Sequence, residues 1–272
     1  MSGPEDDVLY RLRGAVAWVT LNRPAKRNAL TERMLVLLER YLLDASRDDG
    51  VKVMVLAGAA PSFCAGYDLG VGGTAVRDRP DVWERVLTRD IEATLGLWAF
   101  PKPTIAAVQG HCLGGGCEIA MACDMVIAGC SGRFGQPEIR FGAGPATLLT
   151  PFVVAEKIAK MLLFTGDTLD AEQAERVGLV NRVVPDKRLT SEVEALSARI
   201  ATVPLQALRH AKRALIRAEE IKGLRRAVAA NISVGALLNA ADTPEQREFM
   251  AKARSQGLRA ALNWRDRRYG ES

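Results

Sequence analysis

Two glutamates lie in unusually apolar surroundings for a charged residue. Glu118 follows three glycines in GGGCEIAM (114–121), and Glu138 follows a proline in FGQPEI (134–139). Singly, a glutamate in a first helical turn usually pairs with the helix dipole, and one after a proline is usually a solvated loop residue. Together in one buried site, they could supply a general base and a general acid, because burial raises the pKa of the acid. That chemistry can add water across a double bond conjugated to a carbonyl.

Glycine-containing turns could supply the hydrogen-bond donors that such a reaction needs. The N–H of Gly115, in the first turn of a helix, has no partner within that helix and is accessible because glycine has no side chain. A second turn, SFCAGYDL (62–69), follows an apolar strand and makes the Tyr67 N–H a candidate partner. Two such donors can stabilise an oxygen that becomes negative. The alternative is that each turn only lets a helix pack closely on its strand.

The elements that would position these residues alternate between strands and helices to about residue 185. The pattern predicts a hairpin at 8–24 turning at Arg13-Gly14, a helix capped by Thr31, strands at 51–58, 103–110 and 124–129, and helices at 81–99 and 115–123. This alternation indicates an α/β core. Four further helices are predicted at about 190–201, 205–220, 222–240 and 244–262. We therefore expect a core of residues 1–200 and a helical packing or assembly region of residues 201–272.

Composition excludes several classes of protein. The 272 residues are 48% hydrophobic and 25% charged, which is typical of a globular protein large enough to fold without disulfides. The net charge is +5, and its basic excess belongs to residues 201–272, which would suit an anionic ligand or a solvated helical face. Five cysteines among small apolar residues and only two histidines predict no metal site. No apolar run is long enough to span a membrane, and MSGPEDD is no signal peptide, so a cytoplasmic protein is expected.

Several motifs together resemble one known family. These are NRPAKRNAL (22–30), SFCAGYDL (62–69), KPTIAAVQGHCLGGGCEIAMACDMVIA (102–128), FGQPEI (134–139) and TGDTLDAEQAERVGLVNRVVP (165–185). In order and spacing they resemble the enoyl-CoA hydratase/isomerase, or crotonase, superfamily. The resemblance implies a spiral of repeated strand-strand-helix units with C-terminal helices that form trimers, often paired into hexamers.

The resemblance also implies a substrate and a role for each site residue. The substrate is an acyl-CoA thioester, and no separate cofactor is expected because coenzyme A is part of it. Its carbonyl oxygen would lie between the N–H groups of Tyr67 and Gly115, while Glu118 activates water and Glu138 delivers a proton. Binding of coenzyme A is implied for a set of residues near the two turns: Ala25, Lys26, Arg27, Ala65, Gly66, Asp68, Leu69 and Gly114. Trp264 or Arg265 could complete that site.

The chain departs from the family after FGQPEI. Hydratases typically continue with a segment like PGAGGTQRL, whereas residues 140–154 here read RFGAGPATLLTPFVV. Pro145 could still start a helix as its first residue, and we expect the pocket beside Glu138 to have a different lining. Asp68 and Asp124 are interpreted as structural. Trp83 and Trp98 are either core residues or part of an acyl pocket.

Three functions stay open from the sequence. The glutamate pair favours hydration of a 2-enoyl-CoA, or its reverse. Double-bond isomerisation, or another enolate reaction of an acyl-CoA, could use the same scaffold with one glutamate moving the proton. A non-catalytic protein that binds RNA through the basic C-terminal helices is the third possibility, but no aromatic-basic nucleic-acid motif supports it. Neither nucleic acid nor a membrane is therefore expected as a partner.

Overall fold

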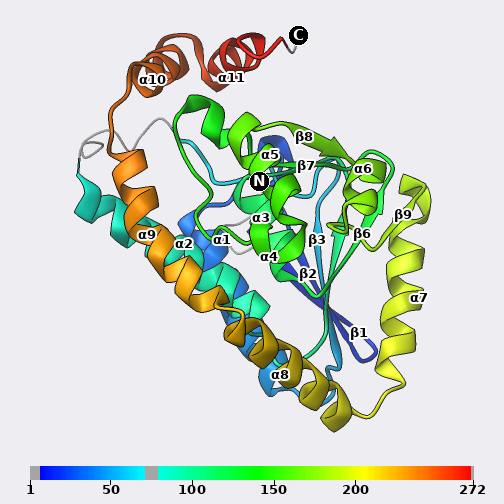
Figure 1. The fold of residues 1–272 in the computed structure, drawn as a ribbon. Helices are drawn as coiled ribbons and strands as arrows, with labels where there is room; N and C mark the ends of the chain where they lie inside the picture. Colours follow the sequence, from blue (N-terminus) through cyan, green and yellow to red (C-terminus); the bar gives the residue numbers. More distant parts are fainter. Residues whose placement is uncertain (1–6, 71–78, 271–272) are drawn as a thin grey trace.

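The structure, a computed structural model, describes residues 7–70 and 79–270. Within these residues the main sheet has six strands, in the order β1-β2-β3-β4-β6-β9 (Figure 1). They are β1 (Val8–Arg13), β2 (Val16–Leu21), β3 (Val53–Gly58), β4 (Thr104–Val108), β6 (Met125–Gly129) and β9 (Arg182–Val184). β1 and β2 form the predicted antiparallel hairpin, and all other neighbours are parallel. The predicted α/β core is confirmed.

Both faces of the main sheet are buried. On one face, α7 (Leu189–Ala201) packs through Leu189 and Val193 against alternate strand residues, which are Val16, Trp18, Val53, Val55, Ile105, Ala107 and Ile127. The intervening strand residues, among them Val19 and Leu56, belong to the larger apolar core on the other face. Burial on both faces explains why the segments 51–58 and 103–110 are continuously apolar rather than alternating.

Two helices of the larger core agree with their predicted positions. In α1 (Glu32–Arg47), the Thr31 side chain accepts a hydrogen bond from the N–H of Met34, as an N-cap should. α2 (Pro80–Trp98) begins with a proline in its first turn. Trp98 is buried in the core and Trp83 packs against it partly buried, which supports the core interpretation of both tryptophans. The glycines at 66, 70, 72 and 73 also predict a loop over 66–73, and this loop lies outside the described residues beyond position 70.

A second sheet is not predicted by the sequence. Its strands, in the order β5-β7-β8, are β5 (His111–Leu113), β7 (Arg133–Gly135) and β8 (Thr168–Asp170). Strands of three residues are too short to show an alternating pattern. β5 leads directly into α3 (Gly115–Ala122), and the Gly114 N–H donates to the carbonyl of Gly135 at 2.9 Å. This sheet therefore fixes the turn from which α3 begins.

The C-terminal region differs from its prediction at one point. α8 (Leu205–Ile221) and α9 (Leu224–Asn239) match predicted helices, but the single helix expected at 244–262 is wrong. The chain forms α10 (Pro244–Gln256) and α11 (Leu258–Arg267), separated by Gly257. Gly257 has φ +87°, a conformation that glycine tolerates and that interrupts a right-handed helix.

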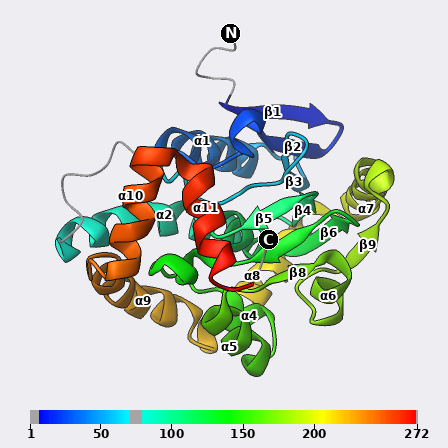
Figure 2. The same ribbon diagram turned by 90° about the horizontal axis from the view of Figure 1, so that it is seen from above.

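The C-terminal helices pack on the rest of the chain in two places. α9 lies along α2, while α10 and α11 both contact the short 3-10 helix η3 (Pro137–Phe141). The Phe141 and Phe249 rings stack there, with centroids 4.4 Å apart. Figure 2 shows α10 and α11 next to each other, seen from above.

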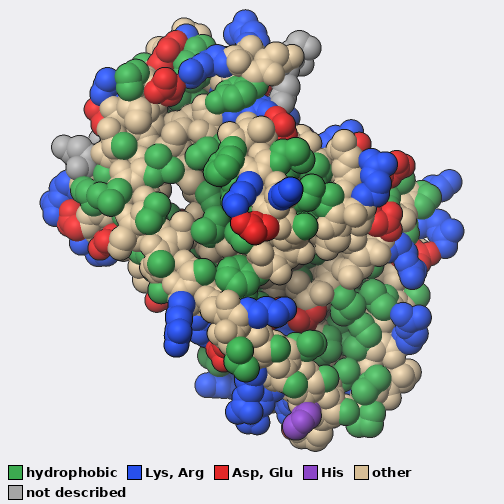
Figure 3. All heavy atoms as spheres, viewed as in Figure 1, with side chains coloured by type: hydrophobic (Ala, Val, Ile, Leu, Met, Phe, Trp, Pro, Cys, Tyr) green, Lys and Arg blue, Asp and Glu red, His purple; other side chains and the backbone are tan. Residues whose placement is uncertain are grey.

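In the space-filling view, Lys and Arg side chains lie along the lower edge of the molecule, where α8 runs (Figure 3). The boundary at residue 200 stays a prediction.

No helix in the described part of the chain combines the length and apolar character needed to cross a membrane.

Candidate active site

Glu118 is fully buried in the first turn of α3. Its Oε1 accepts hydrogen bonds from the N–H groups of Thr147 at 2.7 Å and Leu148 at 2.8 Å. The Thr147 hydroxyl lies 3.4 Å from Oε2. A separate loop therefore holds this carboxyl, so Glu118 is not simply a surface partner of its own helix dipole.

The loop that contacts Glu118 corrects the prediction for Pro145. No helix begins there; the next one is α4 (Thr150–Val153), with Pro151 in its first turn. Leu148 has φ +55°, which a right-handed helix cannot accommodate, and this bend directs two successive N–H groups at one carboxylate oxygen. The Asn231 amide on α9 donates to the carbonyls of Pro145 and Ala146, both at 2.9 Å. Residues 145–148, in the segment that differs from the family motif, thus form a fixed wall beside Glu118.

Glu138 lies on η3 and is partly buried. Its carboxyl faces the turn before α3: a methyl group on Gly114 would lie 3.3 Å from Oε2. The two carboxyls are close enough to interact, since the negative charge of Glu138 contributes to raising the pKa of Glu118. The structure therefore brings the two predicted carboxyls to the same turn.

The turns that carry the two predicted N–H donors are in contact. A methyl group on Gly66 would lie 3.6 Å from the nitrogen of Gly115 and 3.1 Å from the carbonyl oxygen of Leu113. Within the described residues, neither the Tyr67 N–H nor the Gly115 N–H donates a hydrogen bond. Two unused donors on adjoining turns, beside a pair of carboxyls, are what an oxyanion hole requires. Their role stays a prediction.

The Tyr67 turn is held by residues of the motif NRPAKRNAL. The Asn28 amide donates to the carbonyls of Ala59, Ser62 and Phe63, at 2.8, 2.7 and 3.2 Å. Asn28 is fully buried and has φ +56°, in the left-handed region that asparagine tolerates better than most residues. The sequence analysis did not identify Asn28 as a positioning residue. The signal that could have indicated this role is an asparagine within the loop motif NRPAKRNAL.

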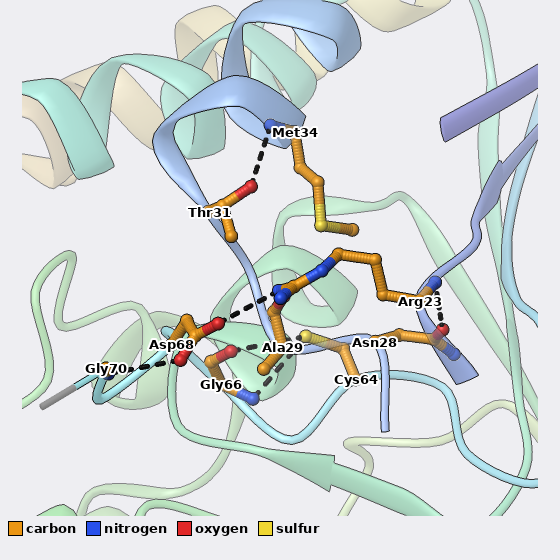
Figure 4. A network of polar contacts seen from close by, with 9 residues as sticks. All are labelled: Arg23, Asn28, Ala29, Thr31, Met34, Cys64, Gly66, Asp68 and Gly70. Atoms are coloured by element: carbon orange, nitrogen blue, oxygen red, sulfur yellow. Dashed lines mark hydrogen bonds and ion pairs between the residues drawn. The ribbon is translucent and has the colours of Figure 1, made fainter. Parts of the chain in front are cut away.

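Arg23 completes this network. Its guanidinium donates to the carbonyl of Ala29 at 2.7 Å and to Oδ2 of Asp68 at 3.0 Å, and Figure 4 shows the two side chains pointing toward each other. Oδ1 of Asp68 accepts from the N–H of Gly70 at 3.1 Å. Asp68 therefore braces the turn that follows Tyr67, which agrees with its structural interpretation.

Replacing Asn28 by alanine should lower the free energy of unfolding by about 3 kcal/mol, because three carbonyls lose their donor and alanine is strained at this φ. Denaturant unfolding measures the change. Asn28→Gly is the matched control, since it relieves the backbone strain without restoring the donor. Its loss should be about 1 kcal/mol smaller than that of alanine. Wild-type stability of the alanine variant would contradict the role assigned to the amide.

A basic group lies beside the Tyr67 turn. Ala25 and Lys26 belong to the exposed η2 (Pro24–Lys26), and the carbonyl of Arg27 accepts from the N–H of Ala65 at 3.0 Å. The Arg27 guanidinium lies 3.1 Å from Nε2 of His111. Lys26 and Arg27 form no ion pair with a carboxylate among residues 7–70 and 79–270. Both cations are thus available to an anionic ligand.

His111 keeps a defined tautomer in this group. Because a guanidinium can only donate, Nε2 accepts from Arg27 and Nδ1 carries the proton toward the Ser62 hydroxyl, 3.2 Å away. Burial lowers the pKa of His111, and the charges of Arg27 and Arg133 lower it further. A neutral imidazole therefore orients Arg27. No sequence spacing indicates that Arg27 and His111 lie together, because they are 84 residues apart.

Four more predicted residues are placed by their packing or by their hydrogen bonds. Leu69 packs in the cluster formed by α10 and α11, and Trp264 belongs to the same cluster. Arg265 donates to Asp266 at 2.6 Å, and its charge lowers the pKa of Glu138 in part. Arg265 is thus close enough for its charge to act on the Glu138 carboxyl. Asp124 accepts from both the N–H and the hydroxyl of Thr104, at 2.8 and 3.0 Å, which agrees with a structural role.

Burial dominates the electrostatics of the carboxyl pair. It raises the pKa of Glu118 to about 8, with a further contribution from the Glu138 charge, against the lowering effect of the Leu148 and Thr147 hydrogen bonds. Burial likewise raises the pKa of Glu138 to about 7. Two interacting carboxyls with such values titrate as a unit. Near neutral pH, the pair therefore shares one proton, which lets one member accept a proton while the other donates.

Other ionisable groups contribute less to the site. In the described ranges, no group of three or more His, Cys, Asp or Glu side chains is arranged to hold a metal ion. Cys64 and Cys112 lie buried beside the two turns as free thiols. Burial raises the pKa of Cys64 to about 12, so its thiol stays protonated. The groups gathered here for chemistry are two carboxyls and two main-chain amides.

The fold and the site, with main-chain donors on two turns beside a glutamate pair, agree with one known family. The enoyl-CoA hydratase/isomerase family model matches residues 11–252. The chain belongs to this family, which confirms the resemblance drawn from its motifs.

Individual relatives agree with this assignment. The probable enoyl-CoA hydratase echA8 of Mycobacterium tuberculosis is 39% identical over 221 residues, covering 79% of this chain and 83% of the relative. The 2,3-dehydroadipyl-CoA hydratase of Escherichia coli is 37% identical, covering 76% and 80%. Among solved structures, an enoyl-CoA hydratase/isomerase from Xanthobacter autotrophicus Py2 superposes with a TM-score of 0.92 at 39% identity, covering 96% of this chain and 98% of that one. The predicted fold class is confirmed.

Proposed function

We propose that this protein is an enoyl-CoA hydratase, which adds water reversibly to the double bond of a 2-enoyl-CoA thioester. The observation that carries the proposal is the meeting of two unused N–H donors, on the Tyr67 and Gly115 turns, with the carboxyls of Glu118 and Glu138. Relatives named as enoyl-CoA hydratases, at 35–39% identity over most of the chain, support it.

The reaction follows from these four groups. The thioester oxygen accepts hydrogen bonds from the N–H groups of Tyr67 and Gly115, which favours electron withdrawal from the double bond. Burial raises the pKa of Glu118 more than that of Glu138, but the two carboxyls titrate as a unit, and the reactive form is the one with the shared proton on Glu138. In that form, ionised Glu118 removes a proton from water as the water oxygen bonds to C3. The resulting enolate oxygen carries negative charge between the two N–H donors, where the dipole of α3 also stabilises it. Protonated Glu138 then donates its proton to C2, the thioester carbonyl forms again, and the product is a 3-hydroxyacyl-CoA.

Coenzyme A binding is supported by the exposed cations beside the site. Lys26 and Arg27 lie next to the Tyr67 turn, and neither is neutralised by a carboxylate in the described chain. Phosphate groups are the natural partners of such cations, and a guanidinium already oriented by His111 binds one without further ordering. Coenzyme A enters as part of the substrate, and no separate cofactor is required.

The test of the function is a screen of the purified protein against 2-enoyl-CoA thioesters that differ in chain length, branching and aromaticity. Loss of the conjugated-thioester absorbance measures hydration. A parallel assay with 3-enoyl-CoA, in which that absorbance appears, measures isomerisation. Hydration of at least one thioester supports the proposal; undiminished absorbance throughout the panel would refute it.

The pH dependence of hydration provides a further prediction. Because the active pair has one proton, kcat/KM should be highest between the two raised pKa values, about 7 and about 8. It should fall below pH 7 as the second carboxyl is protonated, and above pH 8 as the last proton leaves. An ordinary glutamate titrates near pH 4.3. A kcat/KM that stays constant from pH 7 down to pH 5 would contradict the pair as described.

Oligomerisation is part of the proposal. Large apolar side chains are exposed on α8 and α9, namely Leu215, Ile221, Val234 and Leu237. Such surfaces commonly mark protein–protein interfaces. They support a trimer, or a hexamer of two trimers. Sedimentation of the purified protein measures the assembly. The cytoplasmic location stays a prediction.

A further inference from the structure

The side chain of Tyr67 lies against the glycine turn of α3. A methyl group on Gly115 would lie 2.4 Å from Cε2 of the Tyr67 ring and 2.8 Å from Cδ2 and Cζ. The ring can therefore approach this closely only because residue 115 has no side chain. Gly115 and Glu118 are three residues apart and lie on the same side of the helix. The ring thus covers the end of the helical face that carries the first carboxyl.

The other end of the ring reaches α2. The Tyr67 hydroxyl lies 3.4 Å from the carbonyl oxygen of Asp90, to which the Thr94 hydroxyl also donates, at 3.3 Å. Thr94 is a hydrogen-bond partner of the Tyr67 hydroxyl as well. The side chain therefore spans the space between the start of α3 and the middle of α2. Burial, together with the nearby charges of Asp90 and Glu118, raises the pKa of Tyr67 far enough that the phenol stays neutral.

The position of the ring matters for the acyl group. In the proposed reaction the thioester oxygen lies between the N–H groups of Tyr67 and Gly115, and carbons C2 and C3 face Glu118 and Glu138. Carbons beyond C3 must then continue past Glu118. The loop of Thr147 and Leu148 closes one side of that carboxyl. The Tyr67 ring fills the space between Glu118 and α2, so the acyl chain cannot extend in that direction.

We propose that Tyr67 is a specificity-determining residue whose ring, fixed between Gly115 and α2, limits the substrate to 2-enoyl-CoA thioesters with a short acyl chain. The inference rests on the proposed hydratase function and deepens it by assigning a substrate class. A crotonyl group ends next to the ring, whereas a decenoyl group has to displace it. Displacement would break the contact with Gly115 and the hydrogen bonds to Asp90 and Thr94.

The experiment compares wild type with Tyr67→Ala and Tyr67→Phe by measuring kcat/KM for crotonyl-CoA and for 2-decenoyl-CoA. Tyr67→Ala should raise the ratio of decenoyl to crotonyl activity by about tenfold or more, since a few methylenes in an apolar pocket are worth that much. Tyr67→Phe keeps the ring and loses the hydroxyl, so it should keep the wild-type preference. An unchanged ratio in Tyr67→Ala, with both substrates turned over, would overturn the proposal.

Binding measurements separate this inference from the proposed function. Calorimetry with saturated butyryl-CoA and decanoyl-CoA needs no turnover. Wild type should bind butyryl-CoA more tightly than decanoyl-CoA. Tyr67→Ala should lose this preference. If wild type hydrates no thioester but this binding preference is found, the hydratase proposal fails and the role of the ring stands. Equal preferences in wild type and Tyr67→Ala would refute the role of the ring whatever the activity. Should Tyr67→Ala not fold, Tyr67→Leu provides a shorter apolar side chain for the same comparison.

Discussion

Glu118→Gln is expected to lower kcat for hydration by about 10²–10⁴-fold, the usual contribution of a positioned general base. An amide cannot remove a proton from water at neutral pH. The glutamine can still place an oxygen where Oε1 accepts from the N–H groups of Thr147 and Leu148. The wall beside the site should therefore stay in place, and KM should change little. Steady-state kinetics with crotonyl-CoA measures both quantities.

Stability gives an independent check on the same variant. The pKa of Glu118 is raised to about 8 in the folded protein, above its value in the unfolded chain. Its contribution to the free energy of unfolding is therefore greatest below about pH 4.5 and is lost as the pH rises through 8. A neutral glutamine does not titrate. Relative to wild type, the variant should gain stability between pH 5 and pH 9, as measured by denaturant unfolding at each pH.

The control for Glu118→Gln is Glu156→Gln, a change of the same chemistry on an exposed α5 (Glu156–Thr165) residue. It should leave kcat within error of wild type. Wild-type hydration by Glu118→Gln would remove this carboxyl from the mechanism. If the variant loses hydration but still isomerises a 3-enoyl-CoA, one glutamate suffices to move the proton, and the isomerase alternative gains its support.

The sequence was sufficient for those parts of the site that depend on local patterns. A run of apolar residues followed by glycines predicts a strand, a tight turn and a helix start, and this places Gly115 and Glu118 correctly relative to each other. The same pattern before Tyr67 predicts the second turn. The parallel order of β3 and β4 then brings both turns to one end of the sheet.

Other parts of the site depend on contacts between distant segments and were not predictable in this way. Nothing local to Leu148 indicates that its N–H is needed by a carboxyl thirty residues earlier, so the sequence permits a helix start at Pro145 that the structure does not have. Asn28 likewise acts on carbonyls of a different segment. The contact of the Tyr67 ring with Gly115 requires the three-dimensional turn, because a sequence shows that a glycine is present but not which atoms lie against it.

Gly115→Ala is expected to lower kcat/KM by about 10²–10³-fold, as the loss of one oxyanion donor does in other enzymes. The new methyl group would lie 2.4 Å from Cε2 of Tyr67, a distance that no pair of non-bonded carbon atoms tolerates. The ring must therefore move. Because the Tyr67 N–H belongs to the same residue as the ring, its displacement disturbs one donor while the methyl group crowds the other.

Gly96→Ala on α2 is the matched control, since its methyl group would meet Leu42 at an ordinary 3.8 Å and alanine favours a helix more than glycine. It should retain wild-type kcat/KM. The cause of the loss in Gly115→Ala is then tested by combining it with Tyr67→Ala, which removes the ring. If the clash displaces the donors, the double variant should recover about tenfold in kcat/KM over Gly115→Ala, a coupling within the range found for residues in contact. If the two losses simply add, the methyl group itself blocks the thioester oxygen, and the ring has no part in keeping residue 115 a glycine.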